Sequence, residues 1–469
     1  MDDTVKIDNT LSGTKEPFVP LVAGEVRMYV CGVTVYDLSH VGHARSAIVF
    51  DVIQRYLRWR GYRVTFVKNY TDIDDKIIRR ANEQGVSAAE ISERYIAEYD
   101  ADMQALGVAA PDVAPRATAH IPQMIALIER LLAKGLAYVV DGDVYFEVRR
   151  FPPYGKLSRK NLDELLVGAR VDVDERKRDP RDFALWKSTK PGEPSWPSPW
   201  GAGRPGWHIE CSAMAMQYLG ESFDIHGGGD DLIFPHHECE IAQAEGATSK
   251  VFARYWTYNG MVNFGKEKMS KSLGNTLTIR DILTRHHADA LRLFLLGTHY
   301  RKPLEWAEER VQDSARALER FTRLLGEADR GHGPPADALP DDLRTFRTRF
   351  QAAMDDDFNT PQAIGVLFEL SSALYDRLER AHQDPARRPA VAAGLAQLRE
   401  LGGALGLFQR RVETAGPPPA VEALVAERTA ARQARDFARA DRLREEIHRL
   451  GWAVEDAPGG ARVTRQAGQ

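Results

Sequence analysis

A chain of 469 residues is too long for one compact core, so we expect about two to four domains. The formal net charge of −4 excludes a protein that attracts nucleic acid over its whole surface, so any RNA contact must use local basic faces. No apolar run approaches the roughly 20 residues that span a bilayer. Only 3 cysteines occur, scattered along the chain, which argues against a disulfide framework and favours the reducing cytoplasm.

The first part of the chain has the pattern of a strand–helix–strand unit. Residues 26–31 and 64–69 are apolar runs typical of buried strands, and a helix is expected between them over about 42–60. This pattern favours an α/β fold with a doubly wound parallel sheet. The mixed pattern of residues 116–205 is interpreted as an insertion that splits this nucleotide-binding fold.

Proline-rich breaks divide the rest of the chain. Gly333-Pro334-Pro335 and Gly416-Pro417-Pro418-Pro419 interrupt a helical C-terminal third. We therefore predict a split catalytic domain, an insertion, a junction, a helical bundle and a small C-terminal module. The predicted boundaries are 1–115 and 206–260 for the two catalytic halves, 116–205 for the insertion, 261–315 for the junction, 316–412 for the bundle and 413–469 for the C-terminal module.

Two short signatures supply groups that suit a triphosphate. His40-Val41-Gly42-His43 lies at the start of the predicted helix, where unpaired N–H groups favour phosphate and Gly42 allows a flat base to approach. Lys268-Met269-Ser270-Lys271-Ser272 lies in a polar loop, and Lys268 and Lys271 could neutralise a departing pyrophosphate. Alone, the first signature is a weak signal that also fits a helix start with exposed histidines, and a lysine-rich loop is usually only a solvated turn. Their joint presence in this order favours a nucleotide-activating site.

A glycine-rich turn and four scattered polar residues complete the candidate chemistry. The segment His226-Gly227-Gly228-Gly229-Asp230-Asp231 ends a strand, and Asp231 could bind ribose hydroxyls or simply cap the turn. Two thiols, an imidazole and a carboxylate could form a four-ligand zinc site, although isolated Cys and His residues are more often buried packing. These four candidate ligands are Cys31, Cys211, His236 and Glu240.

The two signatures resemble the HIGH and KMSKS motifs of class I aminoacyl-tRNA synthetases, with Val41 where Ile is usual. The residues around them resemble the cysteinyl-tRNA synthetase family, and the similarity extends from Met28 to Val454. The resemblance implies ATP-dependent ligation of L-cysteine to tRNA(Cys) through a cysteinyl-adenylate. It further implies catalytic roles for His40 and His43, a requirement for Mg²⁺ with ATP, and one Zn²⁺ per chain.

The family resemblance implies a function for the zinc site, the selection of cysteine. Zinc favours a thiolate over a neutral hydroxyl, so cysteine could be selected at the metal without a separate editing domain. The resemblance implies that the four candidate ligands hold this ion. Cys239 stands where the family commonly has Asn, and it or His237 could compete with Glu240 as a ligand.

Two further residues are expected in the substrate pocket by the same resemblance. Thr71 matches a position that contacts substrate, and Trp207 could wall the pocket near the metal or serve as ordinary aromatic packing. The acidic run at 72–75 is interpreted as a cap of the next helix.

The C-terminal third resembles the tRNA-binding part of the family. Asp289-Ala290-Leu291-Arg292 opens a helical region, and the turn at 355–360 also resembles the family. Five arginines recur at helical spacing and would form either a basic stripe for phosphates or a salt-bridged solvated face; Asp436 could cap a new helix and divide them. The arginines are Arg428, Arg432, Arg435, Arg439 and Arg442. The resemblance makes Arg432, Asp441 and Asp456 candidates for reading anticodon bases.

Two other functions remain as alternatives. A related ligase joins cysteine to an amino sugar in thiol-cofactor synthesis but lacks the C-terminal module, so the arginine-rich end favours tRNA. A synthetase-like RNA-binding protein without catalysis should have lost the signature residues, which are present here. A monomer is the default expectation, because no exposed coiled coil is predicted.

Overall fold

The computed structural model describes residues 4–160, 175–264, 267–268, 277–328, 339–409, 418–457 and 460–465. The chain forms two compact units, Met1–Gln409 and Arg410–Gln469. The first unit is built around a parallel sheet, and the second contains a helix pair and a hairpin.

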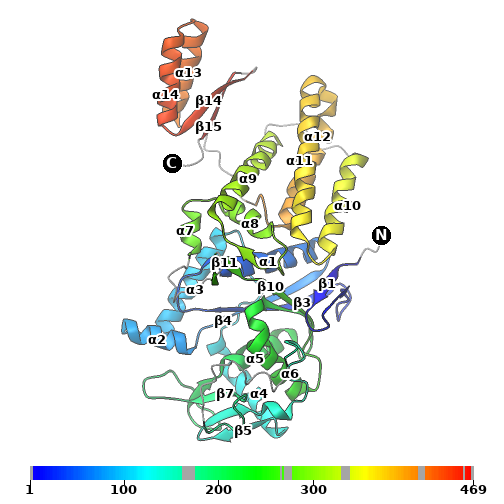
Figure 1. Ribbon diagram of the computed structural model, residues 1–469, viewed down its shortest axis with the longest axis vertical. Helices are drawn as coiled ribbons and strands as arrows, with labels where there is room; N and C mark the ends of the chain where they lie inside the picture. The colour runs from blue at the N-terminus through cyan, green and yellow to red at the C-terminus, as the bar shows by residue number, and fades with distance from the viewer. Residues whose placement is uncertain are drawn as a thin grey trace. The chain divides into compact units, whose positions relative to one another are not determined.

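The central sheet of the first unit has four parallel strands in the order β10-β9-β3-β4 (Figure 1). Helix α1 connects β3 to β4, so the predicted strand–helix–strand unit is confirmed. Because α1 covers one face of the sheet and α5 and α6 cover the other, the fold is doubly wound as expected (Figure 1). The bounds are β3 Glu25–Thr34, α1 Val41–Trp59, β4 Arg63–Thr71, α5 Trp207–Leu219, β9 Phe223–Gly229, α6 Glu238–Thr248 and β10 Ala253–Asn259.

Close packing between α1 and the sheet explains one of the glycines of β9. A Cβ at Gly227 would lie 2.3 Å from Cε1 of Phe50, which is buried in α1. Contacts below about 3 Å do not occur between real carbon atoms, so a side chain at this position would push the helix off the sheet. Gly227 therefore sets the distance between α1 and β9.

Between β4 and β9 the chain leaves the central sheet and forms a second, antiparallel sheet in the order β5-β6-β7-β8. This is the insertion expected from the sequence, and it confirms that the nucleotide-binding fold is split. The bounds are α4 Ile121–Ala133, β5 Ala137–Val140, β6 Asp143–Phe146, β7 Phe183–Ser188 and β8 Gly203–Pro205.

A helical region follows the sheet along the chain. Helix α8 begins at Ala288, so Asp289 to Arg292 opens a helix as predicted. A fully buried ion pair between Arg292 and Asp51, 2.7 Å long, joins α8 to α1. The remaining elements of this unit are β1 Lys6–Asn9, β2 Thr14–Pro17, α2 Asp75–Gln84, α3 Ala88–Ala105, β11 Val262–Phe264, β12 Glu267–Lys268, α7 Ile279–Leu283, α8 Ala288–Leu296, β13 Leu304–Glu305, α9 Glu308–Ala328, α10 Asp341–Asp355, α11 Thr360–Gln383 and α12 Arg388–Ala404.

The second unit contains α13 Pro419–Gln433, α14 Phe437–Arg449 and an antiparallel hairpin of β14 Trp452–Ala457 with β15 Gly460–Arg465. Asp436 caps α14 by accepting a hydrogen bond from the Arg439 backbone N–H at 3.0 Å, so the arginine stripe is divided between two helices as anticipated. Arg428 is buried, which removes it from any exposed stripe.

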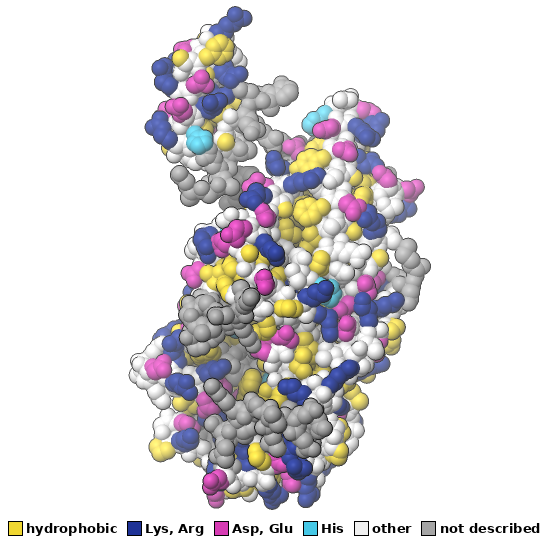
Figure 2. Space-filling view, in the orientation of Figure 1, with side chains coloured by type: hydrophobic (Ala, Val, Ile, Leu, Met, Phe, Trp, Pro, Cys, Tyr) yellow, Lys and Arg dark blue, Asp and Glu magenta, His cyan; other side chains and the backbone are white. Residues whose placement is uncertain are grey.

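The surface agrees with the small net charge. Lys and Arg side chains are interspersed with Asp and Glu over the face shown in Figure 2. Within the described ranges, no helix has both the length and the apolar character needed to cross a membrane.

Candidate active site and metal centre

The first signature forms the start of α1. His40 is the N-cap in extended conformation, and its Nδ1 accepts a hydrogen bond of 3.1 Å from the Gly42 N–H. The His40 N–H in turn donates to Nδ1 of His43 at 3.3 Å, and the two rings stack with centroids 3.8 Å apart. Because each Nδ1 accepts, a neutral ring carries its proton on Nε2. The fold thus prepares two imidazole N–H donors at a helix N-terminus, where anions are favoured.

The segments that flank the second signature lie against the first. Thr278 forms an isolated bridge with His40, the Val41 N–H donates to the Leu277 carbonyl at 3.1 Å, and the Ile279 N–H donates to the Ser39 carbonyl at 3.0 Å. On the other flank, the backbone of Lys268 in β12 pairs with Asn263 of β11. The side chain of Lys268 and all of Lys271 lie outside the described residues.

The glycine-rich turn lies at the carboxyl end of β9, the edge of a parallel sheet where such folds bind ligands. Asp231 follows in an exposed turn, and a Cβ at Gly229 would lie 2.5 Å from its Oδ1. Asp231 therefore covers the end of the strand, and its binding of ribose stays a prediction.

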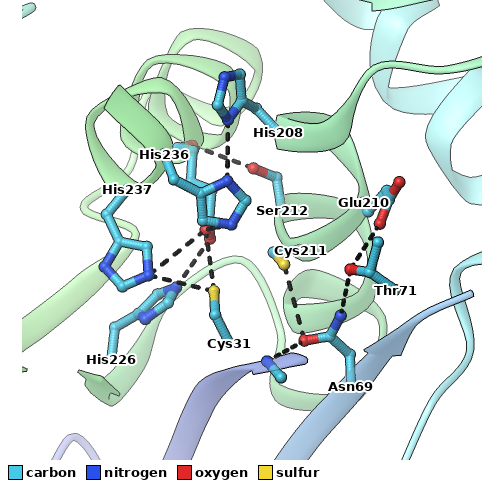
Figure 3. Close-up of polar contacts among 12 residues, drawn as sticks. Cys31, Asn69, Thr71, His208, Glu210, Cys211, Ser212, His226, His236 and His237 are labelled. Atoms are coloured by element: carbon cyan, nitrogen blue, oxygen red, sulfur yellow. Dashed lines mark hydrogen bonds and ion pairs between the residues drawn. The ribbon is translucent and has the colours of Figure 1, made fainter. Parts of the chain in front are cut away.

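The four candidate metal ligands come together in the folded chain. Cys31 lies in β3, Cys211 in α5, His236 in the turn before α6, and Glu240 in α6. Their ligand atoms all lie within 4.8 Å of one another, and all four side chains are buried. His236 Nε2 is 3.0 Å from Glu240 Oε1, and Cys31 Sγ lies 3.2 Å from the same oxygen. Figure 3 shows Cys31, Cys211 and His236 directed into one space.

Burial and the neighbouring side chains shift the pKa values of the groups in this cluster. The hydrogen bond from Cys31 lowers the pKa of Cys211 to about 6, whereas burial and Cys211 raise the pKa of Cys31 well above its usual range. Burial disfavours the charged form of His236, but Glu240 and Cys211 outweigh it and raise the pKa of His236 to about 10. Although burial also opposes ionisation of Glu240, His226 and His236 hold its pKa well below the ordinary value. A thiolate, an imidazolium and a carboxylate thus meet in one buried space, where a divalent cation could replace the protons.

Two more imidazoles surround the cluster. His226 Nε2 lies 2.8 Å from Glu240 Oε2, and His237 Nε2 lies 3.2 Å from Cys31 Sγ (Figure 3). Together with Cys31 and Glu240 they form a second group whose ligand atoms also lie within 4.8 Å of one another. His237 was already a possible ligand from the sequence. His226 was not, because its only local feature is the run of glycines that follows it.

Cys239 is separate from both groups. Its Sγ lies 3.2 Å from the hydroxyl of Tyr154, and burial raises the pKa of this thiol. Among the described residues, the metal-compatible groups contain Cys31 and Cys211 but not Cys239.

A chain of contacts leads from the cluster to a cavity of about 300 Å³. Cys211 Sγ lies 3.8 Å from Asn69 Oδ1, Asn69 Nδ2 donates to Thr71 Oγ1 at 3.4 Å, and the Thr71 hydroxyl donates to Glu210 at 3.0 Å (Figure 3). Glu210 lines the cavity, and burial raises its pKa well above the ordinary value. Thr71 is therefore one contact away from the cavity.

Trp207 forms a wall of the same cavity. Its ring stacks on His236 with centroids 4.2 Å apart, and the side chain remains 39 % exposed. A large aromatic group that touches a candidate metal ligand and also faces solvent could cover a small substrate at the cluster.

The candidate anticodon residues lie in the second unit. Arg432 is in α13, Asp441 in α14 and the backbone of Asp456 in β14. The Asp456 side chain lies outside the described residues, and the three roles stay predictions.

Comparison with protein families decides the classification. Residues 17–316 match the class I (C) tRNA synthetase catalytic domain, residues 349–409 the DALR domain, and residues 414–463 the cysteinyl-tRNA ligase anticodon binding domain. The chain belongs to the cysteine–tRNA ligase family. This confirms the resemblance read from the sequence and places the protein among the class I synthetases as an enzyme.

Relatives in this family match over nearly their whole length. The cysteine–tRNA ligase of Geobacter metallireducens is 51 % identical, covering 97 % of this chain and 99 % of that protein. The enzyme of Alkalilimnicola ehrlichii is 54 % identical, covering 98 % of this chain and 99 % of that protein.

Solved structures show the same fold at much lower identity. Mycobacterium tuberculosis methionyl-tRNA synthetase in complex with methionyl-adenylate matches with a TM-score of 0.60 and 16 % identity, covering 81 % of this chain and 90 % of that chain. The Agrobacterium radiobacter LeuRS in a ternary complex with tRNA matches with a TM-score of 0.61 and 14 % identity, covering 83 % of this chain and 85 % of that chain. These likenesses support the class I fold predicted from the sequence.

Proposed function

We propose that this ligase joins L-cysteine to tRNA(Cys) with ATP through a cysteinyl-adenylate, and that it selects cysteine by binding the substrate thiolate at a zinc ion. Family membership supports the reaction. The proposed selection of cysteine rests on one observation: four buried side chains bring their ligand atoms close together. These are Cys31, Cys211, His236 and Glu240. Mg²⁺ with ATP, one zinc per chain, a cytoplasmic location and a monomeric state belong to the same proposal.

The donor set fits zinc on its chemistry. Two thiols and an imidazole are donors that zinc prefers, and a carboxylate completes a four-ligand site. The low pKa of Cys211 supplies one thiolate near neutral pH. Zinc bound here would act as a Lewis acid that accepts the thiolate of cysteine and attracts the hydroxyl of serine only weakly. His226 and His237 contact Glu240 and Cys31, so we propose that they orient these two ligands.

The protein groups around the cluster divide the remaining work. The Nε2–H groups of His40 and His43 would donate to phosphate oxygens, and Lys268 with Lys271 would neutralise the departing pyrophosphate. Asp231 would bind the ribose of ATP. Catalysis then consists of positioning and charge stabilisation, without a covalent enzyme intermediate.

Substrate contacts are proposed for two residues near the cavity. Trp207 would cover the bound amino acid, since its ring already lies on His236. Thr71, held by Asn69 and Glu210, would line the amino-acid pocket.

The test of activation is the cysteine-dependent exchange of label between pyrophosphate and ATP. We expect exchange with L-cysteine and at least about 100-fold less with L-serine at equal concentration, because discrimination by a polar or metal contact is large. Exchange that serine supports equally well would contradict selection at the metal. Exchange that requires another amino acid would contradict the substrate.

The acceptor is tested separately. An amino-sugar ligase remains the alternative, but the match of residues 414–463 to an anticodon binding domain favours tRNA. Labelled cysteine should therefore appear on tRNA(Cys) transcripts and not on an amino sugar. Transfer to the sugar alone would reverse the assignment.

A further inference from the structure

A buried arginine follows the first signature by two residues. Arg45 lies in α1 with no exposed surface, and its guanidinium donates to five backbone carbonyls. The acceptors are Gly260 at 3.0 Å, Leu295 at 3.2 Å, His299 at 3.3 Å, Tyr300 at 3.3 Å and Lys302 at 2.6 Å. Nε and Nη1 each donate to one carbonyl, and the two hydrogens of Nη2 serve the other three, so four of the five guanidinium N–H donors are used.

Among the described residues, this charged group donates to backbone carbonyls rather than to a carboxylate. Burial lowers the pKa of Arg45 to about 10, with Asp230 opposing the shift from a distance, so the group stays charged at neutral pH. Burying a charge is unfavourable, and charge-assisted hydrogen bonds at the negative end of α8 offset that cost. Since an apolar side chain would avoid the cost, the fork of the guanidinium must serve to hold these carbonyls together.

The five acceptor carbonyls lie in two segments of the chain, one at Gly260 and the other between Leu295 and Lys302. Gly260 follows the end of β10 and lies two residues before β11, and its N–H donates to the Tyr300 carbonyl at 2.8 Å. From there, β11 pairs with β13 on one side and with β12, which contains Lys268, on the other. A Cβ at Gly260 would lie 2.5 Å from the carbonyl carbon of Lys302, so the two backbones touch. Arg45 thus fixes the segment at Gly260, from which β11 and then β12 lead to the second signature.

We propose that Arg45 is a positioning residue for adenylate formation: it fixes β11 and β12 relative to the N-terminus of α1 and so sets where Lys268 stands with respect to His40 and His43. This rests on the proposed function. The opposite flank of the second signature is already tied to α1 by the backbone bonds of Leu277 and Ile279. Arg45 supplies the matching attachment on the β11 side.

The chain offers a matched control. Arg292 is equally buried, donates to the carbonyls of Leu405, Leu106 and Gly107, and also contacts α1, through Asp51. None of these four partners belongs to β11 or β12. A purely structural role for Arg45 therefore predicts that R45K and R292K behave alike.

The experiment compares pyrophosphate exchange, zinc content and melting temperature in the wild-type chain, R45K and R292K. A lysine offers three donors on one atom and cannot reproduce the five-acceptor fork. We expect R45K to raise the KM for ATP and to lower kcat by about tenfold or more, while the KM for cysteine and the zinc content stay at wild-type values. R292K should lower the melting temperature without changing the KM for ATP.

The proposal is overturned if R45K leaves the KM for ATP and kcat unchanged, or if R292K changes them to the same extent. Should R45K fail to fold, Gly260→Ala disturbs the same attachment from the other side and must give the same selective loss with ATP. A wild-type chain that shows no cysteine-dependent exchange would instead refute the proposed function, which separates the two failures.

Discussion

At the residue scale, the cluster shows how three thiols of one chain acquire different chemistry. Cys31 and Cys211 are linked by a hydrogen bond that keeps the proton on Cys31 and leaves Cys211 ionised near neutral pH. Cys239 is equally buried but touches the hydroxyl of Tyr154, and its pKa is raised. Reactivity and metal binding follow the thiolate, so burial alone does not distinguish a ligand from a bystander.

Substitution of single thiols should separate these roles. We expect Cys211→Ser to lose zinc from about one ion per chain to below about 0.1, because serine is a poor zinc ligand. Cys239→Ser is the matched control, since Cys239 belongs to neither metal-compatible group. Metal analysis of the purified chains, followed by pyrophosphate exchange, provides the measurement. Loss of zinc from both variants, or from Cys239→Ser alone, would show that the ligand set is wrong.

Zinc binding should also release protons. Near pH 7.5 the thiol of Cys31 and the imidazolium of His236 are protonated, since both pKa values are raised, whereas Cys211 and Glu240 are already ionised. Coordination requires the deprotonated forms, so we expect about two protons per zinc, and an affinity that falls as the pH is lowered. Calorimetry of the metal-free chain in two buffers of different ionisation enthalpy measures this number. A value near zero would mean that the ligands bind in other protonation states or that other residues bind the metal.

At the element scale, the contact between α1 and β9 determines where the first signature lies. Gly227→Ala should destabilise the fold by about 1–3 kcal/mol, because the added Cβ meets the buried ring of Phe50 at 2.3 Å. Gly365 in α11 is the control: a Cβ there meets nothing within 4 Å, so Gly365→Ala should stabilise by about 0.4–1 kcal/mol. Urea unfolding of both variants tests the pair. Equal effects would remove the packing explanation for Gly227.

The turn after α10 links the bundle to the N-terminal strands. The hydroxyl of Tyr56 in α1 donates to Asp355 at 2.6 Å, and Asp357 accepts from the Asp8 N–H at 3.0 Å and from the Tyr300 hydroxyl at 2.8 Å. Lys15 pairs with Asp356 at 2.7 Å. The turn at 355–360, which the sequence alone described only as a helix boundary, therefore attaches α10 and α11 to α1 and to the β1–β2 pair.

This attachment should make stability depend on pH. Burial raises the pKa of Asp357 from 3.8 to about 6, so between these values the folded chain binds more protons than the unfolded chain. The contribution of Asp357 to stability is therefore largest below about pH 4 and falls by up to about 3 kcal/mol as the pH rises through 6. Asp357→Asn cannot ionise, so its stability relative to wild type should increase over this window. Thermal unfolding at pH 4.5 and 7 measures the difference, and a constant difference would contradict the assignment.

The sequence predicts individual helices and strands better than it predicts the tertiary contacts between them. The strands at 26–31 and 64–69, the helix between them and the cap at Asp436 follow from local patterns, and all are present. The contacts of His226 with Glu240 and of Arg45 with the end of α8 depend on chain crossings that no local pattern encodes. For the four candidate ligands, the residue types suggested zinc only modestly; their proximity comes from strands and helices far apart in the sequence.

At the scale of the whole molecule, the two units have separate cores. The first contains the signature helix, the sheet and the candidate metal cluster, all within residues 1–409. The second has its own small cluster of Val421, Ile447, Trp452 and Val454 and contains the candidate anticodon residues. The candidate activation residues and the candidate anticodon residues therefore lie in different units.

A chain that ends at Gln409 should separate the two activities. Because the candidate ligands and both signatures belong to the first unit, we expect this chain to retain zinc and to exchange pyrophosphate with ATP within about threefold of the full-length rate. Charging of tRNA(Cys) should lose at least about tenfold in kcat/KM, which corresponds to about 1.4 kcal/mol of lost transition-state binding. Filter assays of both reactions, run beside the full-length chain, give the comparison. Equal charging by the two chains would show that the C-terminal unit does not contribute to tRNA binding, whereas loss of exchange with zinc still bound would show that activation depends on both units.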